Sequence, residues 1–102
     1  MKRRVGSISK ALRWEVFARD GECVLAKIEP DHVCKDIWNQ EHAPNDFDRL
    51  TLEHVHREGR MMGRRAPSDA RHLIALDGFA NFSVPSKVQR EAFRAYLEVV
   101  AP

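Results

Sequence analysis

LTLEHV at residues 50–55 and RHLIAL at residues 71–76 are the two stretches that decide the fold. The first alternates apolar and polar side chains, so that Leu50 and Leu52 share one face, as in a half-buried strand. The second is a short apolar run rich in leucine and isoleucine, which also favours a strand. Residues 57–69 contain glycines, a proline and several arginines, so we expect two strands joined by a basic loop.

Helix signals lie on both sides of these strands. Ser9 can cap the start of a helix and Gly21 stands where helices commonly end, which predicts an amphipathic helix between them. Residues 78–82 predict a short helical turn directly after the second strand. Ser86 followed by Gln89 is the capping-box pattern that introduces a longer C-terminal helix.

The remaining stretch, residues 21–48, is rich in Pro, Asn and Asp, so no long regular element is expected there. The chain has 102 residues, of which 43% are hydrophobic, and two cores could not each bury enough apolar surface. We therefore predict one α+β domain over residues 1–102, with residues 1–8 as a flexible basic terminus. Trp14 and Trp38 are expected in the core, where their large side chains supply scarce area.

The formal net charge of +2 is weak evidence for a nucleic-acid partner, but arginines concentrate just after the first strand. Guanidinium groups bind phosphate oxygens well. The predicted DNA-binding residues are Arg57, Arg60, Arg64, Arg65 and Arg71. No apolar run approaches the roughly 18 residues of a membrane span, and no signal-peptide pattern is visible, so we expect a soluble cytoplasmic protein.

Glu53 and His54 are adjacent at the end of the first predicted strand. Phosphodiester hydrolysis needs a base to activate water and a divalent cation to neutralise developing charge. A neutral imidazole can be that base, and a carboxylate can hold Mg²⁺. Taken alone, such a pair is more often an exposed strand carboxylate beside a hydrogen-bonded, half-buried histidine. His56, two residues on, is a candidate phosphate or metal contact or an ordinary exposed histidine.

RWEVFARDGEC at residues 13–23, LTLEHV at 50–55 and SDARHLIAL at 68–76, followed by an asparagine and PSKVQREAFRAYL at 85–97, resemble HNH endonucleases. The resemblance is greatest to small bacteriophage-type members and covers residues 9–97. It implies a small ββα-metal (His-Me) finger with an N-terminal and a C-terminal helix. It also implies a DNA endonuclease that nicks or cuts both strands by a one-metal mechanism.

The resemblance implies a role for each residue that matches the motif. His54 would be the general base, and Glu53 with Asn81 would hold one divalent cation, Mg²⁺ or alternatively Mn²⁺ or Ni²⁺. His72 stands where the family has an asparagine that fixes the loop, so within this catalytic set we expect it to be structural first. A phage-encoded member would act in the cytoplasm of a bacterial host, with phage packaging proteins as candidate partners.

The sequence departs from the family at Asp77 and Ala80, where many members have a second Cys-x-x-Cys pair, which excludes a four-cysteine zinc site. The candidate structural zinc ligands are Cys23, His32, Cys34 and Asp77. The cysteines could instead be small buried hydrophobes, with His32 on the surface. Two other functions stay open: an inactive HNH-like DNA-binding or packaging accessory module, and a purely structural zinc-binding interaction protein.

Overall fold

The computed structural model describes residues 8–57 and 66–102, and over these residues the chain has an α+β fold, as predicted. The elements in chain order are α1 (Lys10–Asp20), α2 (Val24–Ile28), β1 (Leu50–His54), the 3₁₀ turn η1 (Ala70–His72), β2 (Leu73–Asp77), α3 (Gly78–Phe82) and α4 (Lys87–Val100). The expected flexible terminus at residues 1–8 falls, apart from Ile8, outside the described residues.

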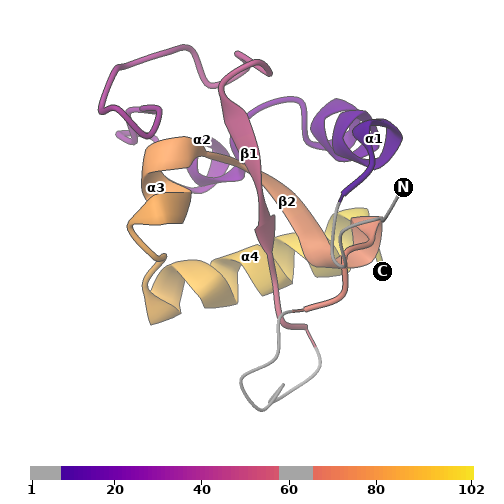
Figure 1. The fold of residues 1–102 in the computed structure, drawn as a ribbon. Coiled ribbons are helices and arrows are strands. Elements are labelled where there is room, and N and C mark those ends of the chain that lie inside the picture. The colour runs from indigo at the N-terminus through magenta and orange to yellow at the C-terminus, as the bar shows by residue number, and fades with distance from the viewer. Residues whose placement is uncertain (1–7, 58–65) are drawn as a thin grey trace.

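The two strands form an antiparallel sheet in which Leu50 pairs with Asp77 and His54 pairs with Leu73. Every residue of β2 is buried, whereas β1 is buried only at Leu50. Figure 1 shows the sheet in the middle of the molecule, with α4 passing behind the lower half of β1 and with α1 and α3 on opposite sides. The sheet is therefore covered most completely along β2.

Both strands differ slightly from their predicted limits, residues 50–55 and 71–76. Val55 lies just past β1, although its N–H still donates to the carbonyl of His72 at 2.8 Å. The second strand starts two residues late because the Asp69 side chain accepts from the N–H of Arg71 and winds residues 70–72 into a 3₁₀ turn. Local side-chain capping here overrides the apolar pattern.

The predicted helices are confirmed, together with their caps. The Ser9 side chain accepts from the N–H of Leu12, and Gly21 ends α1 in the left-handed region at φ 76°. Ser86 and Gln89 form the complete capping box of α4. The five-residue helix α2 was not predicted, because so short a segment shows no helical period, but no long element occurs in residues 21–48.

The core lies between the sheet and the helices. Its buried members are Phe17, Cys23, Val24, Leu25, Cys34, Leu50, Val55, Ile74, Ala75, Leu76, Phe93 and Leu97. The prediction that both tryptophans are core residues is wrong, since Trp14 is 46% exposed and Trp38 is 75% exposed. Trp38 sits in a tight turn that the Asp36 carboxylate closes by accepting from the N–H groups of Trp38 and Gln40. That turn presents the indole to solvent.

The C-terminal end of α1 is tied to the rest of the fold by Arg19 and Asp20. The Arg19 guanidinium donates to the carbonyls of Ala70 and Leu73 at 2.6 and 2.7 Å. The buried Asp20 carboxylate accepts from Arg19 at 2.8 Å, from the N–H of Ala75 at 2.8 Å and from the Tyr96 hydroxyl at 2.6 Å. One carboxylate thus joins α1, β2 and α4.

Asp20→Asn is expected to lower the free energy of unfolding by about 3–5 kcal/mol, because it removes one member of a buried, fully hydrogen-bonded ion pair. Urea denaturation followed by circular dichroism measures the change. Glu15→Gln, on the exposed face of the same helix, is the matched control and should stay within about 0.5 kcal/mol of the wild type. Equal effects of the two substitutions would contradict the role of Asp20.

Within the described residues, none of the helices has the length and apolar content that crossing a membrane requires.

Candidate functional site

The elements β1, β2 and α3 pack against one another, and α3 directly follows β2 in the chain. Asn81 of α3 is fastened to β1, since its side-chain nitrogen donates to Thr51 Oγ1 at 3.0 Å and to the Leu52 carbonyl at 3.1 Å. These contacts hold the Asn81 amide beside the strand residues that immediately precede Glu53. The two sequence-predicted metal ligands are therefore on adjoining parts of the structure.

Glu53 and His54 line one small pocket of about 50 Å³ at the end of β1. Its other lining residues are Val55, His56, Arg90, Phe93 and Arg94. A space of this size has room for at least one group the size of a water molecule. A larger cavity of about 410 Å³, lined in part by Arg13, Trp38 and Thr51, contains neither Glu53 nor His54.

Burial raises the pKa of the Glu53 carboxyl to about 7, although the backbone N–H of His54 and the charge of Arg90 both act to lower it. The carboxylate form is therefore short of compensating partners in this pocket. A cation beside Glu53 would favour that form, and a hard oxygen donor of this kind suits Mg²⁺. The environment of Glu53 is chemically suited to a metal ligand.

His54 lies half-buried at the same end of β1, and its Nε2 is 3.0 Å from the Ser68 hydroxyl. Ser68 belongs to the segment that leads into η1, on the other side of the basic loop. A hydroxyl at this distance orients the imidazole ring, as a base that must meet a substrate requires. The structure thus gives His54 a defined orientation beside Glu53.

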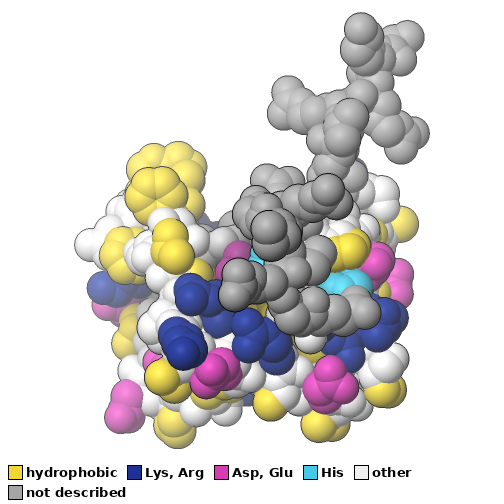
Figure 2. All heavy atoms as spheres, turned by 90° about the horizontal axis from the view of Figure 1, so that it is seen from below, with side chains coloured by type: hydrophobic (Ala, Val, Ile, Leu, Met, Phe, Trp, Pro, Cys, Tyr) yellow, Lys and Arg dark blue, Asp and Glu magenta, His cyan; other side chains and the backbone are white. Residues whose placement is uncertain are grey.

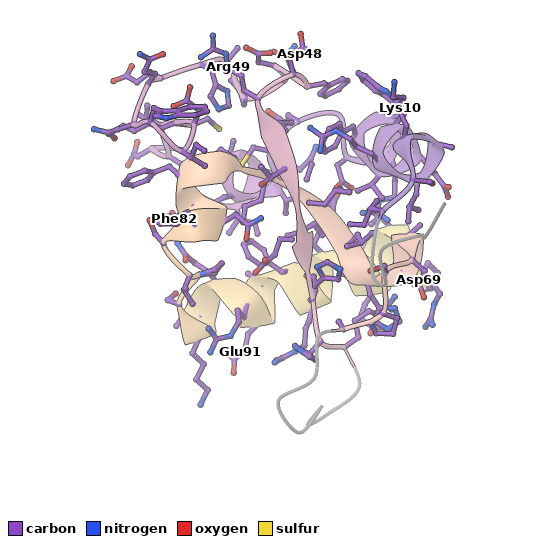
Figure 3. All side chains as sticks on the ribbon, viewed as in Figure 1. Lys10, Asp48, Arg49, Asp69, Phe82 and Glu91 are labelled. Atoms are coloured by element: carbon purple, nitrogen blue, oxygen red, sulfur yellow. The ribbon has the colours of Figure 1, made fainter. Side chains whose placement is uncertain are left out.

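His72 is buried, at 4% exposure, and its ring Nδ1 is 2.7 Å from the Asp69 carboxylate. Its backbone carbonyl accepts from the N–H of Val55 and so continues the pairing of the two strands. Figure 3 places Asp69 near the end of the sheet opposite to Asp48 and Arg49. These contacts join His72 to the cap residue of η1 and to the end of β1, and its structural role within the catalytic set stays a prediction.

Of the five predicted DNA-binding arginines, the structure describes two, Arg57 and Arg71. Arg60, Arg64 and Arg65 lie outside the described residues, and Arg71 is exposed. The Arg57 side chain is only 3% exposed, and it donates to the carbonyls of Arg71 and Ala101 at 2.8 and 2.6 Å and pairs with Glu98. Arg57 ties the end of α4 to the strand end in this structure, and its role as a phosphate contact stays a prediction.

The second cluster brings together Cys23, His32, Cys34 and Asp77, whose ligand atoms all lie within 4.8 Å of one another. The Asp77 carboxylate is 2.8 Å from His32 Nε2 and 3.3 Å from Cys23 Sγ. Both cysteines and Asp77 are buried. The chain around α2, the following loop and the end of β2 therefore converge on one group of metal-ligating side chains.

Both thiols of this cluster are held in the neutral form. Burial raises the pKa of Cys23 to about 11. The pKa of Cys34 is also raised, first by burial and then by the neighbouring Cys23 thiol. Thiolates in such a site need a cation beside them, and metal binding to cysteine releases the thiol protons. The donor set of two sulfurs, an imidazole and a carboxylate is one that Zn²⁺ accepts.

Sequence reasoning missed Arg90 and Arg94, which line the pocket of Glu53 and His54 from α4. Their signal was present, because the two residues are four apart and share a helix face with the core residue Phe93 between them. Recognising them required knowing that α4 packs across the end of β1.

No protein-family model, curated protein or solved structure matches this chain.

Proposed function

We propose that this protein is a metal-dependent DNA endonuclease of the HNH kind, with β1, β2 and α3 as its ββα-metal finger. One observation carries the proposal: Glu53 and His54 line the same pocket at the end of β1, while Asn81 of α3 is hydrogen-bonded to the preceding residues of that strand. The base and the carboxylate thus come from β1 and the amide from α3, a helix that packs against that strand. Binding of DNA without cleavage is the alternative that the experiments below distinguish.

His54 acts as the general base in this proposal. Its neutral imidazole takes a proton from the attacking water, and the hydrogen bond to Ser68 keeps the ring oriented for that transfer. A base held in place by a second side chain is the usual arrangement in hydrolytic sites. His72 supports the site indirectly by fixing the start of β2 through Asp69 and Val55.

Glu53 and Asn81 are the protein ligands proposed for a single divalent cation, Mg²⁺ or alternatively Mn²⁺ or Ni²⁺. Both hydrogen bonds of the Asn81 amide use its nitrogen, so Oδ1 is the atom suited to a hard cation. The desolvated Glu53 carboxyl supports the same assignment. When bound, the cation supplies charge neutralisation at the phosphate and the departing oxygen.

Glu53→Gln is expected to raise the Mg²⁺ concentration that gives half-maximal cleavage by at least about tenfold, since an amide is a weaker ligand than a carboxylate. A Mg²⁺ titration of cleavage of a labelled DNA duplex measures this. Glu91→Gln changes an exposed carboxylate on α4 in the same way and should leave the titration unchanged. The same half-maximal Mg²⁺ concentration in wild type and Glu53→Gln would remove Glu53 from the metal site.

A structural Zn²⁺ is proposed for the cluster of Cys23, His32, Cys34 and Asp77. Bonds of about 2.0–2.3 Å let one ion reach four donors that already lie this close, with small side-chain adjustments. Asp77 also caps α3 by accepting from the N–H of Ala80 at 3.2 Å and binds the N–H of Lys35 at 3.2 Å. The zinc ligands would thus hold the irregular segment against the start of the helix that carries Asn81.

A further inference from the structure

Arg90 and Arg94 lie on the face of α4 that borders the pocket of Glu53 and His54. The helix is fixed there by Phe93 and Leu97, both fully buried, and by the capping box at its start. Residues four apart on a helix are neighbours, so the two guanidinium groups act at adjoining positions. The arginines are therefore presented to the pocket by a rigid element.

The hydrogen bonds of Arg90 and Arg94 do not use all of their guanidinium N–H donors. Arg94 donates through Nε to the His56 carbonyl at 2.6 Å, which fixes its side chain along the pocket. Arg90 is exposed, and one terminal nitrogen donates to the Pro85 carbonyl at 2.6 Å. A guanidinium carries five N–H donors in a planar fork, a geometry suited to phosphate oxygens. Arg90 thus retains donors at the edge of the pocket.

His56, which lines the same pocket, adds a second sign of a ligand. Its Nδ1 is buried and has no hydrogen-bond partner among the described residues. Leaving a buried polar nitrogen unpaired is unfavourable, so such atoms are usually satisfied by a ligand or by water. The imidazole can donate to an anion or accept from a bound water.

Charge and size together indicate the class of ligand. Two guanidinium groups face one carboxylate, Glu53, so the pocket carries an excess of positive charge. Its volume of about 50 Å³ admits a small group. Figure 2 shows Lys and Arg side chains gathered, with acidic ones among them, on the face seen from below, and α4 lies toward that side in Figure 1. An anion of phosphate size, reached from this face, fits both constraints.

We propose that Arg90, with Arg94 beside it, forms a phosphate-binding subsite on α4 that holds the phosphodiester group next to His54. The inference rests on the proposed function, since it places DNA at the same pocket, but it concerns binding and not proton transfer. Arg90 grips the phosphate oxygens, and Arg94 fixes the backbone at His56 and adds positive charge. The simpler role for Arg90, a counter-charge for Glu53 alone, predicts no direct effect on DNA affinity.

The test compares Arg90→Ala and Arg90→Lys with Lys87→Ala, which removes an exposed charge from the same helix outside the pocket. Fluorescence anisotropy of a short labelled DNA duplex, without added Mg²⁺ and at several salt concentrations, measures affinity. Arg90→Ala should weaken binding at least about fivefold and lower the salt slope by about one, more than Lys87→Ala does. Arg90→Lys should restore only part of the affinity, because it keeps the charge without the fork.

Single-turnover cleavage with Mg²⁺ separates this inference from the proposed function. DNA binding that depends on Arg90 in a wild type that does not cleave supports the subsite and overturns the nuclease. Cleavage by the wild type, with Arg90→Ala equal to Lys87→Ala in affinity and salt slope, overturns the subsite and leaves the nuclease. Wild-type protein without measurable DNA binding overturns both. Matching thermal unfolding midpoints of the variants establish that affinity, and not folding, has changed.

Discussion

Replacing His54 by alanine is expected to slow phosphodiester cleavage by about 10²- to 10⁴-fold, the usual contribution of a general base. The fold should survive the change, because His54 is only half-buried and lies at the end of β1, where its Nε2 is 3.0 Å from the Ser68 hydroxyl. Loss of a hydrogen bond of this kind costs about 1 kcal/mol. The predicted signature is a large loss of rate with a nearly unchanged thermal unfolding midpoint.

Single-turnover kinetics at saturating protein isolate the chemical step of this comparison. His42→Ala is the matched control, since His42 is a partly buried histidine outside the pocket that bonds the Ala43 carbonyl. That variant should cleave like the wild type. Equal rates for His54→Ala and the wild type would exclude His54 as the base, even if cleavage itself were real.

Loss of the proposed zinc site is expected to have the second large effect, this time on folding. Cys34→Ser should lose bound zinc and most of its folded population at 25 °C. Structural zinc sites have apparent binding free energies on the order of 10 kcal/mol, which is comparable to the whole stability of a domain. Metal content by mass spectrometry, together with circular dichroism before and after a strong chelator, measures both losses.

Cys34→Ala distinguishes the zinc site from the alternative in which the cysteines are small buried hydrophobes. A ligand role predicts that Ala and Ser substitutions lose zinc equally and unfold alike. A packing role predicts that Cys34→Ala costs little while Cys34→Ser costs more, because only the serine buries a hydroxyl. Wild-type protein that is folded without bound zinc, and whose unfolding temperature a strong chelator leaves unchanged, would contradict the metal site.

Much of the fold could be predicted from the sequence because its signals are local. Ser9, Gly21 and the Ser86–Gln89 pair cap their helices through neighbouring residues, so their pattern is readable without the fold. The strands were readable from alternation and apolar runs, but η1 was not, since it depends on how the Asp69 side chain is turned. The prediction for Trp38 fails because composition does not indicate whether a turn directs its side chain toward the core or toward solvent.

In the candidate site, too, the residue types could be predicted from the sequence, whereas the contacts that depend on tertiary packing could not. The residue types Glu53, His54 and Asn81 could be proposed from their order, but the bonds from Asn81 to β1 follow from the packing of α3. The basic neighbours of Arg57 predict a contact with DNA phosphate. In the structure its guanidinium donates to the carbonyls of Arg71 and Ala101, which no local pattern indicates. Arg90 faces the pocket only because α4 crosses the end of β1, a tertiary fact that no local pattern contains.

Relaxation of supercoiled plasmid tests the central claim most directly. Zinc-loaded wild type and His54→Ala are incubated with the plasmid with Mg²⁺ or without it, and nicked and linear products are quantified on a gel. We predict that the wild type converts the plasmid only when Mg²⁺ is present and that His54→Ala converts almost none under either condition. Folded wild-type protein that binds the plasmid but leaves it supercoiled with Mg²⁺, Mn²⁺ and Ni²⁺ would contradict the nuclease and indicate a DNA-binding module.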